Sequence, residues 1–421
     1  MASGANGMRG AETLVVGGGI VGAAVALELA RRRDDVLVVE RDALGHGCSY
    51  GNAGWLTPSL AFPLPAPGVL AQGLLWLFRR DSPLRIAPRL SLDLARWLWG
   101  FVRATDERRF RRGVEALTAL SLASLEEFRR IAAGTTVATG FAECGRLSIC
   151  ETPATLAAER HEIDVLARFG LEARLLGVEE VRARVPALTG PLAGGLLTPG
   201  DAVIEPLAAV EALAEEARRL GARFATGVEV YDFERRGGRI TAAATTAGPI
   251  AAGRVVLAAG AWSKRLAAGL GFRLPVLGGK GYALIVPPLD PQPALPLKLL
   301  ERRIAVTPRV GSLRIAGTLE VVDADWSVSP RRVAAIVAGA RAMLRLPEPL
   351  EVREVWRGLR PVTPDGLPVL GRAPGYQNLF VAAGHQMLGL HCAPASGRLL
   401  AELVLGETPS FDPAPFRADR F

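Results

Sequence analysis

Three glycines and one acidic residue near the start of the chain have the spacing of a nucleotide-binding turn. Gly17, Gly19 and Gly22 form a Gly-x-Gly-x-x-Gly pattern, and Glu40 follows. The first glycine permits a tight turn, the second lets the backbone approach a pyrophosphate, and the third lets a helix pack closely on a strand. A carboxylate after the next strand can accept hydrogen bonds from ribose hydroxyls. The pattern predicts a dinucleotide site.

The elements that would position these residues can be recognised on either side of the turn. Residues 13–16 are apolar or β-branched and predict a buried strand, 23–33 predict a helix, and 36–39 predict a second strand ending at Glu40. Ile20 and Val21 stand at the helix N-terminus, where free N–H groups and the positive dipole end favour a phosphate. This pattern alone does not distinguish FAD from NAD.

A loop of small and hydroxylated residues follows Glu40, where a nicotinamide dehydrogenase would continue as another βαβ unit. Such a loop offers backbone N–H groups for further phosphate and flavin contacts. The loop resembles that of the D-amino acid oxidase superfamily of flavoproteins, and residues 49–54 with Pro58 are most similar to bacterial D-amino acid dehydrogenases. The resemblance implies cofactor contacts from Arg41, Ser49, Gly51, Asn52, Ala53 and Gly54. Some relatives carry a flavin-linked histidine where Gly51 stands, so it also implies non-covalent FAD.

Later segments extend the resemblance over nearly the whole chain. Residues 255–263 match a second nucleotide contact of the family, at Ala259, Gly260 and Trp262, and the strand at 227–230 resembles the one lining the adenine, through Val228. The stretch 358–368, Gly-Leu-Arg-Pro-Val-Thr-Pro-Asp-Gly-Leu-Pro, is more specific. So is 382–389, which leads into a helix at 394–405.

The resemblance implies an enzyme that oxidises a CH–NH group. The expected reaction is oxidative deamination of a small D-amino acid to the 2-oxo acid and ammonia. The hydride would pass from the α carbon to flavin N5, and the electrons would then pass to a quinone-type acceptor. Two alternatives stay open. One is oxidation of a secondary amine such as sarcosine, a proline derivative or an opine, and the other is a flavin-holding subunit without turnover.

Arg360 and Tyr282 are the candidates for substrate contact. Arg360, in Gly-Leu-Arg-Pro, matches the family position that holds the substrate carboxylate, which a planar guanidinium can bind through two hydrogen bonds. The alternative is a salt bridge between lobes. Tyr282, in Lys-Gly-Tyr, resembles a residue that faces the substrate, and the alternative is a tyrosine half-buried on a strand.

The turn before the last helix is the candidate for stabilising the reduced flavin. Negative charge grows at the N1–C2=O edge, and a helix N-terminus suits it. The backbone of Met387, Leu388 and Gly389 is assigned to this task, with Gly384 permitting close approach. His385 is a candidate for direct catalysis or for a flavin contact. Some relatives that accept glycine carry arginine where Met387 stands, which disfavours glycine as the preferred substrate.

Composition excludes several other classes. The formal charge is +8, but the basic residues are scattered and almost all are arginines, so we expect no nucleic-acid partner. Four cysteines without metal-ligand spacing predict no metal site and suit a reducing compartment. No secretory leader is recognised, and we expect a cytoplasmic protein. Homo- or hetero-oligomers stay open.

The segment 69–103 has a different character. It contains apolar runs, and within it Asp93, Arg96 and Arg103 fall on one narrow helical stripe beside a wide apolar face with two tryptophans. One interpretation is a buried helix pair. The other is a surface that docks on the cytoplasmic face of the inner membrane, where a quinone acceptor would lie.

The predicted fold is α/β with two discontinuous domains. A Rossmann-like FAD-binding domain is expected from 1–60, 195–269 and 355–421. A substrate-binding domain of α+β type, on a mostly antiparallel sheet, is expected from 61–194 and 270–354.

Overall fold

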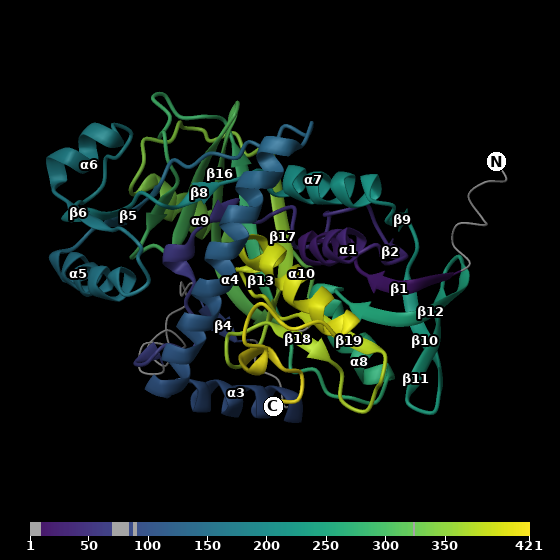
Figure 1. Ribbon diagram of the computed structural model, residues 1–421. Coiled ribbons are helices and arrows are strands. Elements are labelled where there is room, and N and C mark those ends of the chain that lie inside the picture. The colour runs from purple at the N-terminus through teal and green to yellow at the C-terminus, as the bar shows by residue number, and fades with distance from the viewer. Residues whose placement is uncertain (1–9, 70–83, 87–90, 323–324) are drawn as a thin grey trace.

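The computed structural model describes residues 10–69, 84–86, 91–322 and 325–421, and it consists of two sheets with helices around them (Figure 1). The first sheet has eight strands. Its central order is β9 (Arg223–Thr226), β2 (Val36–Glu40), β1 (Gly10–Val16), β12 (Gly248–Leu257) and β19 (Leu379–Ala383), all parallel. The antiparallel strands β11 (Arg239–Thr245), β10 (Val230–Arg236) and β18 (Val369–Arg372) complete it. The two predicted strands lie inside β1 and β2.

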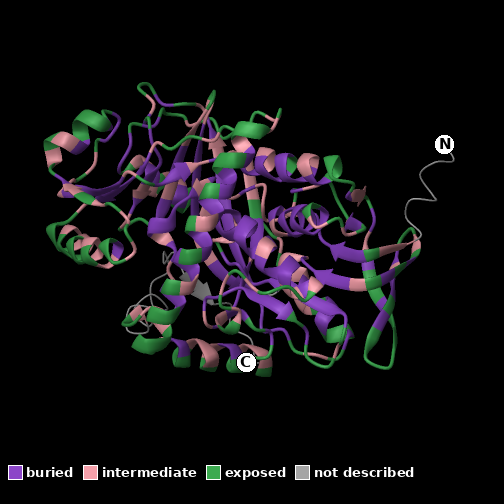
Figure 2. Cartoon of the chain, viewed as in Figure 1, coloured by how far each residue is buried: buried purple, intermediate pink, exposed green. Residues whose placement is uncertain are grey.

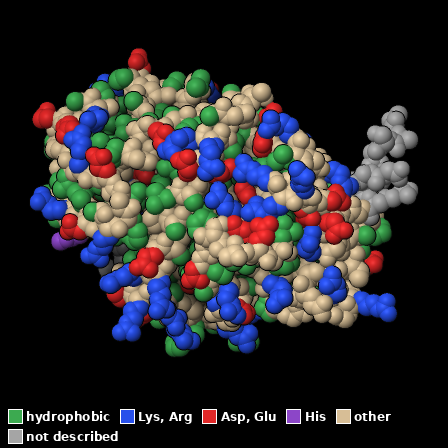
Figure 3. Space-filling view, viewed as in Figure 1, with side chains coloured by type: hydrophobic (Ala, Val, Ile, Leu, Met, Phe, Trp, Pro, Cys, Tyr) green, Lys and Arg blue, Asp and Glu red, His purple; other side chains and the backbone are tan. Residues whose placement is uncertain are grey.

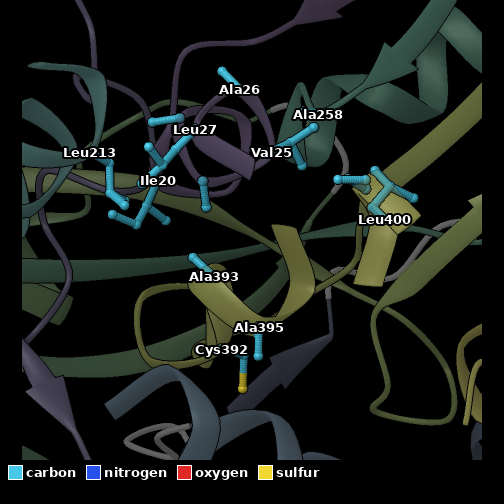
Figure 4. Close-up of a cluster of buried hydrophobic side chains, with 14 of the residues drawn as sticks. Ile20, Val25, Ala26, Leu27, Leu213, Ala258, Cys392, Ala393, Ala395 and Leu400 are labelled. Atoms are coloured by element: carbon cyan, nitrogen blue, oxygen red, sulfur yellow. The ribbon is translucent and has the colours of Figure 1, made fainter. Parts of the chain in front are cut away.

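Helices cover the first sheet and bury its main core. Helix α1 (Ile20–Arg31) packs against α10 (Gly389–Leu405) and α7 (Pro206–Arg219), and α4 (Glu107–Gly134) packs on α10. Figure 4 shows part of the shared cluster, with Ile20 on α1, Leu213 on α7 and Leu400 on α10. Truncating one such fully buried leucine to alanine costs about 2–5 kcal/mol. This core holds the turn between β1 and α1 in place.

The second sheet has nine strands and is mostly antiparallel. Its order is β17 (Glu354–Val362), β13 (Leu277–Val286), β16 (Ser312–Val322), β15 (Ile304–Arg309), β14 (Leu297–Leu299), β5 (Arg146–Cys150), β7 (Gly194–Thr198) and β6 (Arg174–Leu176), with β4 (Leu84–Ile86) on β16. Among the described strand pairs of this second sheet, only β14–β5 and β16–β4 are parallel. Helices α5 (Pro153–Ala167), α6 (Val178–Arg184) and α9 (Pro330–Arg341) accompany it. The predicted fold class is confirmed.

Short elements connect the two sheets. They are the two-stranded pair β3 (Trp55–Leu56) and β8 (Ala202–Val203), the 3-10 turns η2 (Pro58–Leu60), η3 (Gly260–Trp262) and η4 (Ala414–Phe416), and helix α8 (Ser263–Gly269). Both sheets are largely buried, whereas α5 and the end of the β10–β11 hairpin are largely exposed (Figure 2).

Three stretches of the chain do not belong to the lobe in which they were predicted. Residues 195–198 and 355–362 were assigned to the FAD-binding domain, but they belong to β7 and β17 of the second sheet. Helix α4 was assigned to the substrate domain, but it packs on α10 and α7 over the first sheet. The reason is physical. An apolar strand or helix face predicts that the element packs against another one, but the sequence pattern does not identify that other element.

Helix α3 (Leu92–Ala104) is the described helix of the segment 69–103, of which residues 70–83 and 87–90 lie outside the described residues. Trp97 is buried and donates a 3.2 Å hydrogen bond to the Val362 carbonyl. Trp99 is 65% exposed on the opposite side. The interpretation as a buried helix therefore fits Trp97, whereas Trp99 lies at the surface. No described helix combines the length and apolarity needed to cross a membrane.

Candidate functional site

A cleft lies beside the carboxyl ends of β1, β2, β12 and β19, where the turn before α1 meets the turn before α10. Many of the predicted cofactor residues line it: Gly17, Gly19, Ile20, Val21, Glu40, Arg41, Ser49, Asn52, Val228, Ala259, Gly260, Trp262 and Gly389. His385 lines it too. Segments more than 350 residues apart in sequence thus form one site. Open α/β sheets bind ligands at this end of their strands.

The glycine turn is built for close approach. Gly17 has a φ of +111°, and a Cβ on it would lie 2.6 Å from the Ala258 carbonyl oxygen. Gly22 does not line the cleft; a Cβ on it would lie 1.9 Å from the Gly17 carbonyl oxygen. Gly22 therefore lets α1 start directly against the turn, which is the role expected of the third glycine.

Polar groups around α1 fix the shape of the cleft. Glu40 accepts hydrogen bonds of 2.7 Å from the Gly18 N–H and 3.0 Å from the Asp42 N–H. Ser49 Oγ accepts a 3.0 Å hydrogen bond from the Ile20 N–H, and the first turn of α1 contains no acidic residue. The first turn of α1 therefore contributes no carboxylate of its own to the positive end of the helix dipole, which suits an anionic pyrophosphate.

Several residues assigned to the cofactor lie next to the cleft rather than in its wall. Gly51 gives room to the Trp356 ring, which a Cβ would meet at 2.0 Å. The Ala53 carbonyl accepts a 2.8 Å hydrogen bond from Thr307, and Gly54 and Gly384 take positive φ values in their turns. Met387 is 43% exposed, and Leu388 is the residue before α10. These residues shape the loops that carry the lining residues.

Other lining residues were missed from the sequence. They include Gly47, Cys48, Glu229, Arg265, Pro361, Ala382, Ala383, Gln386 and Leu390. The Cys48 thiol donates a 2.7 Å hydrogen bond to the Leu359 carbonyl, and burial raises the pKa of this thiol to about 11. Cys48 therefore stays protonated at neutral pH and does not act as a nucleophile.

Arg360 reaches from β17 across the neighbouring strand β13. Its Nη1 donates a 2.9 Å hydrogen bond to the Thr318 carbonyl on β16. Within the described part of the chain no carboxylate pairs with Arg360, so the alternative of a salt bridge between lobes is not seen there. Burial lowers the pKa of the guanidinium. Arg360 precedes Pro361, which lines the cleft, but Arg360 itself is not among the lining residues.

Two backbone features make room for this side chain. A Cβ on Gly281 would lie 1.8 Å from Arg360 Nη1, so only glycine leaves the guanidinium its place. The β13–β16 register shifts between Lys280 and Tyr282, and Thr318 there has a φ of +67°. A β-branched residue rarely takes this conformation. The bulge directs the Thr318 carbonyl to Arg360, a use of bulges seen beside active sites.

Tyr282, on β13, was expected to face the substrate, with a tyrosine half-buried on a strand as the alternative. Its side chain is fully buried in the core of the second sheet. The hydroxyl donates a 3.2 Å hydrogen bond to Glu320 and accepts one of 3.3 Å from the Ser329 N–H. Tyr282 does not line the cleft, and both of its hydrogen bonds are made to other residues of the second lobe. Its position therefore argues against the expected substrate contact.

His385 is 4% exposed, and its Nε2 lies 3.1 Å from Ser396 Oγ. Burial lowers the pKa of this histidine to about 3. The imidazole is therefore neutral at physiological pH. Efficient general bases have a pKa near the working pH, so His385 suits a hydrogen-bonding role better than proton transfer.

Comparison with known proteins identifies the cleft. The family model DAO, described as FAD dependent oxidoreductase, matches residues 12–403. The chain belongs to this family. FAD is therefore the cofactor of this oxidoreductase, as predicted, and the open N-terminus of α1, the glycine cradle and Glu40 fit its adenosine and pyrophosphate.

Individual relatives of this FAD-dependent oxidoreductase cover almost its full length. A D-amino acid dehydrogenase from Cereibacter sphaeroides is 33% identical over 97% of this chain and 95% of its own. Another from Rhizorhabdus wittichii is 32% identical over 97% of this chain and 100% of its own. The solved glycine oxidase from Geobacillus kaustophilus is 28% identical with a TM-score of 0.80, covering 98% of this chain and 99% of its own.

One aromatic stack joins the two lobes of the oxidoreductase at the cleft. Trp262, on η3, stacks on Trp326, after β16, with ring centroids 5.2 Å apart and planes 17° from parallel. The Arg41 guanidinium lies over the Trp262 ring, 4.3 Å from its centroid, and both residues line the cleft. The loop of Trp326 is held by Asp325, whose carboxylate lies 2.5 Å from Lys280 Nζ. This ion pair holds the pKa of the Asp325 carboxyl well below its ordinary value.

Proposed function

We propose that this protein oxidatively deaminates a small D-amino acid to the 2-oxo acid and ammonia. The observation that carries the proposal is Arg360, a partly buried guanidinium without a carboxylate partner among the described residues, next to the FAD cleft. A substrate carboxylate is the natural partner for such a cation. Two relatives at 32–33% identity are named D-amino acid dehydrogenase, which supports this substrate class.

The residues of the chain have separate tasks in this reaction. Arg360 binds the carboxylate and orients the α carbon, with its guanidinium held by the Thr318 carbonyl and seated over Gly281. His385 stays neutral and keeps its hydrogen bond with Ser396, so water takes the proton of the substrate ammonium. Bound FAD would supply the acceptor for the hydride of the α carbon. The backbone N–H groups before α10 face the cleft at Gly389 and stabilise negative charge there.

The test is an anaerobic screen of flavin reduction. D- and L-amino acids, prolines and N-methyl amines are added in turn, and bleaching of the flavin absorbance is recorded with and without a quinone analogue. Bleaching by D-amino acids supports the proposal. Bleaching only by N-methyl amines or prolines would assign the protein to secondary amines, and no bleaching by any of them would indicate a flavin-holding subunit.

The substitution Arg360→Ala tests the role of the guanidinium. Loss of a hydrogen-bonded charge pair should raise the KM for the reducing amino acid roughly 10- to 100-fold. The control is Arg353→Ala, which removes an exposed arginine just before β17. An unchanged KM in the Arg360 variant would contradict the assignment.

We also propose that α3 attaches the protein to a membrane surface, on the cytoplasmic face, where a quinone acceptor is available. Three apolar side chains of α3 project outward, Leu92, Trp99 and Val102, which are 75%, 65% and 44% exposed. Arg96 and Arg103 are exposed on the same helix, and basic side chains (Lys or Arg) gather along this edge of the molecule, as Figure 3 shows. Exposed tryptophan beside arginine is typical of a membrane interface.

A further inference from the structure

Gln386 occupies a turn that strains its backbone. It lies between β19 and α10, and its φ of +53° is in the left-handed region. Residues with a Cβ adopt this region rarely, and glycine adopts it freely. The turn is firmly tied down: the Gln386 N–H donates a 3.0 Å hydrogen bond to the Pro361 carbonyl, and the Leu388 N–H donates one of 2.8 Å to His385. The backbone therefore cannot relax without breaking these contacts.

The side chain of Gln386 carries a second cost. The residue is 6% exposed, and its Nε2 is buried without a hydrogen-bond partner among the described residues. An unpaired buried donor destabilises a folded protein, and native proteins contain few of them. Gln386 also lines the FAD cleft. A strained backbone and an unpaired amide thus occur together at one residue in the wall of the site. Features that lower the stability of the fold in this way cluster at functional sites.

We propose that the Gln386 side-chain amide donates a hydrogen bond to an acceptor oxygen of bound FAD, which adds Gln386 to the cofactor-binding residues. Of the lining residues in this turn, Gly389 and Leu390 carry no side-chain donor, and His385 Nε2 lies 3.1 Å from Ser396 Oγ. The Gln386 Nε2, in contrast, is buried without a partner among the described residues. A neutral donor suits an uncharged carbonyl, whereas Arg360 is placed for an anion. The inference depends on FAD and not on the identity of the substrate.

Two substitutions test it on the full-length chain, and they change the strain differently. Gln386→Gly removes the amide and relieves the left-handed φ. The FAD-depleted variant should therefore melt at a higher temperature than the FAD-depleted wild type, yet bind FAD roughly 3- to 10-fold more weakly. Gln386→Leu removes the amide and keeps the strain, so it should weaken FAD binding by a similar factor without the full gain in Tm. FAD binding is measured by quenching of flavin fluorescence.

The control is Gln377→Leu, which removes an exposed amide outside the cleft and should leave FAD affinity unchanged. FAD affinity within twofold of wild type in Gln386→Leu would overturn the proposal. So would a rise in the KM of a reducing substrate with unchanged FAD affinity, because the amide would then serve the substrate. A lower Tm of the FAD-depleted Gln386→Gly variant would show that the residue stabilises the fold, and would also overturn it.

Discussion

Gly281 has no side chain, and the Arg360 guanidinium occupies the space that a side chain would fill. A Cβ there would lie 1.8 Å from Arg360 Nη1, so Gly281→Ala should push the guanidinium away from the Thr318 carbonyl. We expect the KM for a carboxylate-bearing substrate to rise about 10-fold or more, because a displaced guanidinium loses its geometry for the carboxylate. FAD affinity should stay unchanged. Steady-state kinetics and flavin titration measure the two quantities.

Gly134→Ala is the matched control, because a Cβ on Gly134 meets nothing within 4 Å. If the KM of Gly281→Ala equals that of this control, the guanidinium does not need its present position, and the contact proposed between Arg360 and the substrate fails with it.

Some of the predicted site residues depend on a short stretch of sequence, whereas others depend on which distant segments pack together. Gly17, Gly19 and Glu40 line the cleft as expected, because their roles depend on spacing along one βαβ unit. Gly51 was assigned from the family resemblance of its loop, and Met387 from its place just before a helix N-terminus. Neither signal shows which way a residue of a loop points. That no described carboxylate pairs with Arg360 depends on which residues β13, β16 and β17 bring near it, and this pairing is not visible in the sequence. A polar residue between Gly384 and Gly389 was the one signal that could have indicated Gln386.

At the scale of elements, helix α3 exposes three large apolar side chains, Leu92, Trp99 and Val102. If it docks on a membrane, the protein should co-sediment with vesicles of phosphatidylglycerol and phosphatidylcholine. Trp99→Glu should reduce the bound fraction several-fold, because it replaces an apolar contact with a repelled charge. Binding should also weaken at high salt, since the arginines of α3 and of the start of α4 would contribute through screened attraction.

Tyr231→Glu is the control for this experiment, because Tyr231 is an aromatic residue 59% exposed on β10, away from α3. Quantitative recovery of the wild type in the supernatant would remove the membrane proposal. Equal loss of binding in both variants would show that net charge, and not the α3 face, governs sedimentation.

The elements themselves were more predictable than their partners. The strands in β1 and β2 follow from short apolar runs, and the helix after the glycine turn follows from its composition. The lobe of β7, β17 and α4 did not follow, because long-range pairing decides it. Trp97 shows the same limit within one helix: periodicity placed both tryptophans on an apolar face, and only the position of Val362 separates the buried one from the exposed one.

At the scale of the whole molecule, the two lobes meet at the cleft through the stack of Arg41, Trp262 and Trp326. Arg41 and Trp262 line the cleft, whereas Trp326 comes from the second lobe and restrains Trp262 from behind. Arg357 Nε donates a 3.0 Å hydrogen bond to the Trp326 carbonyl, which fixes the loop to β17. The stack therefore couples the position of the substrate lobe to the wall of the FAD site.

Trp326→Ala should loosen this coupling. An aromatic pair contributes about 0.5–1.5 kcal/mol beyond its buried area, so we expect FAD to bind roughly 3- to 10-fold more weakly and to dissociate faster on dilution. Val328→Ala, which truncates an exposed side chain of the same loop, should leave both values unchanged. Trp326→Phe keeps a stacking ring and should restore most of the affinity. If Trp326→Ala retains FAD as well as Val328→Ala does, the stack between the lobes does not contribute to FAD binding, and the first lobe alone determines the affinity.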